Sequence, residues 1–215
     1  CHAVKSDVRR GYLSGQPVTN NYSLELALLG GDETHPDGRT KTFGYQQGHY
    51  YSDCYLSGSM TCVDCHEPHG QRYRNINGRA LPGRFDDAQC TDCHASKAVQ
   101  PEQHTHHPAE SEGSRCVSCH MPFVQEAAVG SEIRYTRSDH TIGNPRPELD
   151  QQLGIANACR NCHTDRSTEQ VAQDTRRWWG EPKPLRPIIA ALVSAKSTAD
   201  FEKIILAKDT THRFA

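Results

Sequence analysis

Methionine, tryptophan and long apolar segments are all scarce in this chain of 215 residues. It holds 2 Met and 2 Trp, and only 35% of its residues are hydrophobic. The best apolar run, from Pro187 to Val193, is too short to cross a bilayer, which takes about 20 apolar residues in a helix. The composition therefore excludes a membrane-spanning helix in this sequence, and it offers poor material for a conventional hydrophobic core.

An excess of charge of one sign is absent as well. The sequence has 24 Lys and Arg against 26 Asp and Glu, which gives a formal net charge of −2. Nothing in this balance indicates a basic surface for nucleic acid or for an anionic membrane.

Cysteine and histidine, in contrast, recur in a fixed pattern. The motif C-x-x-C-H appears four times, at 62–66, 90–94, 116–120 and 159–163. Cysteines three residues apart lie about one helical turn apart, so both thiols can add to the vinyl groups of one porphyrin. The adjacent histidine then binds the iron from the proximal side, as in c-type haem attachment. The predicted residues are Cys62, Cys65 and His66; Cys90, Cys93 and His94; Cys116, Cys119 and His120; Cys159, Cys162 and His163.

Two other uses of paired cysteines fit the pattern less well. Zinc ribbons also carry C-x-x-C pairs, but zinc gives no reason for a histidine at the same following position every time. Disulfides within each pair would close very small loops and would connect nothing distant. Covalent haem is the interpretation that accounts for all four motifs.

Haem also explains the low apolar content. Porphyrins bring a large apolar surface of their own, so we expect the polypeptide to wrap them instead of packing on itself. The predicted fold is mostly irregular and helical, with a haem-packed core and short helices around the motifs. Without haem, the chain should be largely unfolded, because so little apolar burial cannot offset the loss of chain entropy.

Covalent haem also predicts where the protein works. In bacteria and archaea the attachment takes place outside the cytoplasm, so we expect a periplasmic, cell-surface or extracellular protein. An export signal would then have been removed or would lie upstream. Two propionates per haem make the loaded protein more acidic than its sequence unless they pair with basic residues. Candidates for this pairing are Arg72, Arg74, Arg79 and Arg84.

The second axial ligand of each iron is predicted to be histidine. The chain has 13 His and only two methionines, Met60 and Met121, both cramped beside a motif. Bis-histidine, low-potential haems follow from this balance. His49, His107 and His140 each precede a motif by a moderate loop. His69 is too close to His66 for the same iron, but it can reach a neighbouring haem.

Other histidines fit a distal role less well. His35 precedes Pro36 and is expected in a turn over 35–38, and His212 lies far from any motif. An ordinary surface position remains the alternative for each single distal candidate.

The organisation changes near residue 165. We expect a multihaem cytochrome domain over 1–165, loop-rich over 1–45 and with a short helix over 46–57. Residues 166–215 form a helical segment that would begin a repeat domain. Its first helix has Ser167 as N-cap, Gln170 in the capping-box position and Gly180 at its end. Further helices follow Pro187 and start at Ser197, the last with Phe201, Ile204 and Ile205 on one face. Trp178 and Trp179 would either cover a haem edge or anchor the first helix.

Three stretches resemble a known family: "HTHHPAESEGSRCVSCHMP", "SDHTIGNPRP" and "NACRNCHTDRSTEQVAQDTRRWWG". They are similar to multihaem cytochromes that carry tetratricopeptide or HEAT-type repeats after the haem domain. That family is distantly similar to pentahaem nitrite reductases and octahaem hydroxylamine oxidoreductases. The resemblance covers roughly residues 1–180. It implies that the distal ligands are His49, His69, His104, His107 and His140.

The resemblance also implies that Cys1 and His2 are the tail of a fifth haem motif. A lipidated Cys1 at a lipoprotein N-terminus is the alternative. Cys54 is left over, either as a buried inert thiol or in a disulfide.

Electron transfer is the function that these features favour. Closely spaced low-potential haems would form a carrier or a conduit, with other redox proteins or copies of the chain as partners, up to an oligomer or filament. One alternative is an oxidoreductase acting on a small nitrogen or sulfur compound at a haem with an open coordination position. None of the four motifs, however, replaces the proximal His with Lys, as the nitrite reductases do. Another alternative is a docking module, and no catalytic residue is assigned.

Overall fold

The computed structural model describes residues 3–24, 32–41, 44–58, 60–70, 72–123 and 138–206. Its helices are α1 (Tyr45–His49), α2 (Asp53–Gly58), α3 (Cys62–Cys65), α4 (Ala88–Thr91), α5 (Ala95–Ala98), α6 (Pro101–Thr105), α7 (Cys116–His120), α8 (Pro147–Leu153), α9 (Thr168–Trp179), α10 (Pro187–Ser194) and α11 (Thr198–Leu206). Its strands are β1 (Lys5–Asp7), β2 (Tyr22–Leu24), β3 (His66–Glu67), β4 (Arg72–Arg74) and β5 (Ala80–Leu81). No helix in these ranges is long and apolar enough to cross a membrane.

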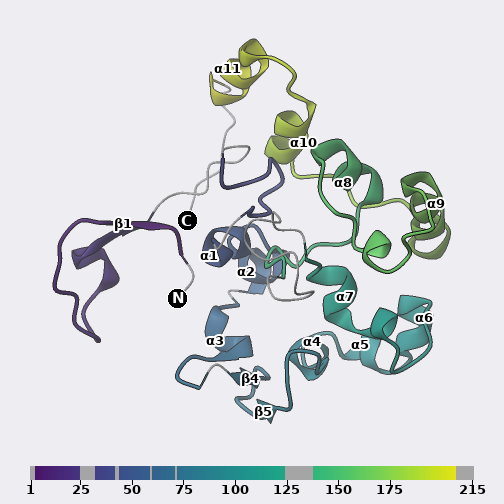
Figure 1. The fold of residues 1–215 in the computed structure, drawn as a ribbon, viewed down its shortest axis with the longest axis horizontal. Coiled ribbons are helices and arrows are strands. Elements are labelled where there is room, and N and C mark those ends of the chain that lie inside the picture. The colour runs from purple at the N-terminus through teal and green to yellow at the C-terminus, as the bar shows by residue number, and fades with distance from the viewer. Residues whose placement is uncertain are drawn as a thin grey trace.

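The elements follow one another around a centre formed by α1 and α2 (Figure 1). From α3 the chain runs through β4, β5 and α4 to α6, then through α7 to α8 and α9, and finally to α10 and α11. The hairpin of β1 and β2 lies apart on the opposite side. The haem motifs are thus spread along the arc instead of being gathered at one point.

Each C-x-x-C-H motif forms the helical turn that its spacing predicts. The backbone N–H of His66, His94 and His163 donates to the carbonyl of the first cysteine of its own motif. The motif at 116–120 is helix α7 itself. This turn places the two cysteines of a motif on one side of the backbone, ready for one porphyrin.

Two small antiparallel sheets were not expected from the sequence. β1 pairs with β2 in the region predicted to be loop-rich, and β3, β4 and β5 form a three-stranded sheet. In the latter, His66 lies opposite Tyr73 across β3 and β4. The sheet therefore fixes the backbone of the first proximal histidine directly after its helical turn.

The three helices predicted after residue 165 are present, whereas a repeat domain beginning there stays a prediction. α9 starts with the Ser167–Gln170 capping box and ends at Gly180, which has φ of +77°. α10 begins at Pro187, and α11 spans Thr198–Leu206. Ile204 is half-buried, whereas the side chains of Phe201 and Ile205 lie outside the described part of the structure. The helix expected over 46–57 is instead divided into α1 and α2.

Few apolar side chains are buried in the described part of the chain, as the composition predicts. They are Leu81, Ile155, Ala158, Val171, Ala172 and Ile189. Among the described residues, buried polar residues outnumber the buried apolar ones. A buried ion-pair cluster is centred on Arg39, whose guanidinium lies 2.7 Å from both Asp37 and Asp150. This group joins the predicted turn at 35–38 to α8. In the turn, the Gly38 N–H donates to the His35 carbonyl at 3.0 Å.

Candidate haem-binding sites

Three pairs of histidine rings lie close together, with 3–38° between the ring planes, and each pair joins a motif histidine to one from elsewhere in the chain. His66 and His140 have ring centres 6.3 Å apart. His120 and His104 are 6.2 Å apart, and His163 and His107 are 5.8 Å apart. The structure thus brings three of the five candidate distal ligands to three of the four proximal histidines.

These separations fit two imidazoles on one iron. An imidazole nitrogen binds a transition metal at about 2.0–2.1 Å, so two rings on opposite sides of an iron have centres roughly 6 Å apart. In bis-histidine haem the porphyrin supplies the remaining ligands. Accordingly, no cluster of three or more His, Cys, Asp or Glu side chains suited to a metal ion occurs within the described residues.

The hydrogen bonds of these rings leave Nε2 for a metal. Nδ1 lies 2.7 Å from the Thr105 carbonyl in His107 and 2.8 Å from the Ser138 carbonyl in His140. In His120, Nδ1 lies 3.1 Å from the Gly143 carbonyl. A carbonyl only accepts, so Nδ1 carries the proton in each ring. Metal-binding histidines show this same arrangement, which fixes the tautomer and the ring orientation.

The charge state of one pair also suits coordination. Burial lowers the pKa of His104, with a smaller contribution from Lys97. Burial likewise lowers the pKa of His120, although the hydrogen bond to the Gly143 carbonyl acts in the opposite direction. Both rings are therefore favoured in the neutral form, which is the form that binds a metal.

Neighbouring motifs lie close enough for their cysteines to interact. The thiols of Cys90 and Cys116 hydrogen-bond to each other, which lowers the pKa of Cys90 and raises that of Cys116. Burial raises the pKa of Cys119 to about 11, and the nearby Cys162 adds to the rise. The second motif thus adjoins the third, and the third adjoins the fourth.

Two tyrosines that were not expected from the sequence flank the first site. The ring of Tyr45 lies 4.5 Å from that of His140, with 28° between the planes. The ring of Tyr73 lies 5.1 Å from that of His66. Aromatic residues stand in the sequence before and after the motif, but their spacing carries no signal of this contact.

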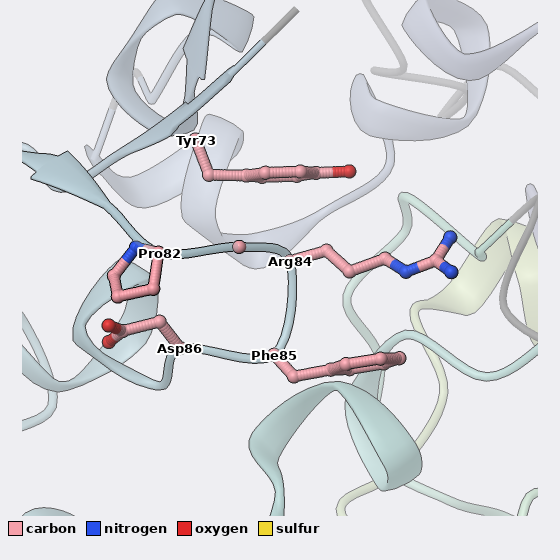
Figure 2. Close-up of a pocket in the computed structure, with 6 residues that line it drawn as sticks. Tyr73, Pro82, Arg84, Phe85 and Asp86 are labelled. Atoms are coloured by element: carbon pink, nitrogen blue, oxygen red, sulfur yellow. The ribbon is translucent and has the colours of Figure 1, made fainter.

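An open cleft of about 710 Å³ borders this first site. Figure 2 shows the rings of Tyr73 and Phe85 roughly parallel on opposite walls, with Arg84 extending between their levels. The guanidinium groups of Arg84 and Arg115 lie 5.1 Å and 4.6 Å from the centre of the Phe85 ring. Aromatic walls and a cation suit a planar group with acidic substituents, and Arg84 is one of the predicted propionate partners.

The remaining predicted ligands are placed differently. No ring contact joins His94 to another histidine of the described residues. His49 Nε2 lies 2.7 Å from the Met60 carbonyl, and its Nδ1 lies 3.3 Å from Ser52 Oγ. The side chain of His69 is 94% exposed, with Nδ1 3.3 Å from a Glu67 oxygen. The roles of His49 and His69 stay predictions.

Several other residues of interest are placed as follows. His35 lies in its predicted turn, where burial lowers its pKa to about 4. Cys54 is a half-buried free thiol, and burial raises its pKa. Cys1, His2 and His212 lie outside the described residues. A fifth haem site therefore stays a prediction.

Comparisons with known proteins give one matching family model and one similar solved structure. The family model of the outer membrane cytochrome MtrC/MtrF-like, domains II/IV, matches residues 84–199. Among solved structures, the outer cell wall cytochrome OcwA resembles the chain with a TM-score of 0.52 and 14% sequence identity. The alignment covers 83% of this chain and 50% of that one, so the chain corresponds to about half the length of OcwA. At this identity the likeness concerns the fold.

Proposed function

The chain belongs to the MtrC/MtrF-like family of outer membrane cytochromes, and we propose that it passes electrons along a row of bis-histidine c-type haems. Family membership makes it a multihaem cytochrome that transfers electrons through c-type haem. When bound, the haems supply the one-electron chemistry. The chain attaches them through its motif cysteines, orients their axial ligands and limits the access of water.

The observation that carries this proposal is the set of three closely spaced histidine pairs. We assign His66 with His140, His120 with His104, and His163 with His107 as axial pairs. Ring separations of 5.8–6.3 Å and the carbonyl-bound Nδ1 atoms support each assignment. The adjoining cysteines of successive motifs support short distances between haems, which is what electron transfer along a row requires.

One proximal histidine remains, His94 of the second motif, and we propose His69 as its distal ligand. The carboxylate of Glu67 beside Nδ1 orients the His69 ring as in metal-binding carboxylate–histidine pairs, and the side chain is 94% exposed, which leaves Nε2 accessible. His49 is the other remaining candidate, but chain atoms lie beside both of its ring nitrogens. A fifth haem at Cys1 and His2 remains part of the proposal.

The place of action is proposed from the similar proteins. One is named for the outer membrane and the other for the outer cell wall, which supports a cell-surface or extracellular position for this chain. Its partners would be other redox proteins or copies of itself, including a homo-oligomer or a filament.

Single substitutions test the axial assignments. His104→Ala, His107→Ala and His140→Ala should each convert one haem from low-spin to high-spin and should allow one equivalent of carbon monoxide to bind the reduced protein. His212→Ala serves as the control, since it lies far from any motif in sequence. The assignments are wrong if the three variants retain the low-spin spectrum of the unsubstituted protein. The mass of the denatured chain counts the haems, because thioether links survive denaturation.

A second candidate function rests on His94 alone. It is exposed, and no second histidine ring faces it in the described residues. An iron bound there without a distal ligand could bind and reduce a small nitrogen or sulfur compound. Carbon monoxide binding to the unsubstituted reduced protein would favour this candidate, and its absence would favour electron transfer alone.

A further inference from the structure

One short segment supplies candidate ligands to two different motifs. His104 faces His120 of the third motif at 6.2 Å, with 3° between the ring planes. His107, three residues later, faces His163 of the fourth motif at 5.8 Å. A shift of this segment would therefore disturb two sites together.

The chain changes direction within this segment, at the end of α6. α6 ends at Thr105, and His106 then adopts the left-handed conformation with φ of +57°. This change of backbone direction at His106 lets the side chains of His104 and His107 point to different sites. His107 is held further by Thr105, whose Oγ1 accepts from the backbone N–H and whose carbonyl accepts from Nδ1. Left-handed backbone is uncommon for residues with a side chain, although histidine adopts it more often than most, and here it ends α6 as it ends many helices.

Two tryptophans of α9 contact this segment from far along the chain. Trp179 Nε1 donates a hydrogen bond of 2.7 Å to the carbonyl of His104, a residue 75 positions earlier. The ring of Trp178 lies 4.6 Å from that of His106, with 12° between the planes. Trp179 also meets His106 edge-on at 5.5 Å. Helices α6 and α9 lie on the same side of the molecule, at the right of the view (Figure 1).

α9 is itself well anchored. Its capping box closes the N-terminus, Val171 and Ala172 are buried, and Arg176 forms an ion pair with Glu148 of α8. The helix also follows the fourth motif directly in sequence. The tryptophans therefore stand on a fixed support beside the histidine segment.

We propose that Trp178 and Trp179 are positioning residues that hold residues 104–107 so that His104 and His107 serve two adjacent haems at once. This inference rests on the proposed axial pairs. Trp178 stabilises the left-handed His106 by covering its ring. Trp179 fixes the backbone at His104 through its indole N–H. Trp179 makes this hydrogen bond to the chain although the residue is 43% exposed.

The test compares tryptophan variants of the haem-loaded protein. Trp179→Phe keeps an aromatic ring but removes the donor, and Trp178→Leu removes the ring that covers His106. The control is Val99→Ala, since Val99 is 77% exposed in the connection before α6. The readouts are the high-spin absorption band, the low-spin g-values by electron paramagnetic resonance, and carbon monoxide bound by the reduced protein, each relative to the unsubstituted chain.

The loss of one hydrogen bond should raise the population with His104 detached roughly five- to tenfold. Trp179→Phe should therefore bring partial high-spin character to the haem that His104→Ala opens fully. The double variant should bind up to two further equivalents of carbon monoxide, and added imidazole should restore the low-spin spectrum. Val99→Ala should match the unsubstituted protein.

Three results would overturn the inference. Unchanged g-values and no carbon monoxide binding in the double variant would show that the tryptophans do not position the ligands. More than two open haems would indicate general loosening instead of a defined role. If His104→Ala and His107→Ala themselves open no haem, the axial pairs of the proposed function are wrong, and the positioning role is wrong with them.

Discussion

Replacing Arg39 by methionine should destabilise the protein by about 3–5 kcal/mol, the usual cost of removing one partner from a buried ion pair. The Arg39 guanidinium lies 2.7 Å from both Asp37 and Asp150, and the three side chains are only 11%, 10% and 4% exposed. Burial raises the pKa of Asp150, whereas Arg39 and, to a smaller extent, Arg146 lower it, so Arg39 is the main group that favours the charged carboxylate. Without Arg39, the carboxylates of Asp37 and Asp150 remain buried and lose the positive charge that they share.

Thermal unfolding of the haem-loaded protein, followed by Soret circular dichroism, measures the effect. A loss of 3–5 kcal/mol corresponds to a fall in Tm of roughly 6–20 °C for a chain of this size. The double variant Arg39→Met with Asp150→Asn should recover part of the loss, because the unpaired charge of α8 is then removed as well. A single variant within 2 °C of the unsubstituted protein would refute the reasoning, and so would a double variant whose loss equals the sum of the two single losses.

Three further predictions concern single positions. Gly38→Ala should cost at least about 1–2 kcal/mol, because φ is +95° and a Cβ would lie 2.6 Å from the Tyr51 ring; the Tm checks it against Gly58→Ala, where a Cβ meets open space. Ser167→Ala should cost about 0.5–2 kcal/mol by removing the N-cap of α9, and Ser197→Ala, which removes the hydroxyl that accepts from the Asp200 N–H at the start of α11, provides a comparison. Burial lowers the pKa of His35 to about 4 from 6.5, so its neutral form is favoured in the fold. The stability that comes from neutral His35 is therefore complete above pH 6.5 and is lost as the pH falls to 4. This loss is on the order of 1–2 kcal/mol after solvent screening, and His35→Asn should flatten the dependence of Tm on pH over that range.

Local chemistry explains which features could be predicted from the sequence. The turn at His35 needs a glycine at its fourth position, and the ends of α9 need a capping serine and a terminal glycine, so both are visible within a few residues. The helical turns of the motifs follow from the cysteine spacing in the same way. The candidate distal histidines could be selected by number and position along the chain.

Long-range contacts explain the features that could not be predicted. Which distal histidine meets which motif depends on how the arc of helices closes, and His140 meets the first motif although it precedes the fourth. Tyr45 and Tyr73 flank that site through tertiary packing alone. The strands were missed because they are two or three residues long, too short for an alternating pattern to appear.

The sparse core leads to a last prediction, for the chain without haem. The buried apolar side chains of the described residues are mostly small or medium-sized and are scattered over several elements, so their burial cannot offset the entropy of ordering the chain. Haem attachment should therefore provide most of the stability, since each pair of axial histidines then closes a contact between distant segments. A chain made in the cytoplasm without haem should show no cooperative thermal transition by far-ultraviolet circular dichroism, whereas the loaded chain should show one. A cooperative transition in the haem-free chain would mean that the polypeptide alone specifies the arc of helices, and the histidine pairs would then be a consequence of the fold and not its main support.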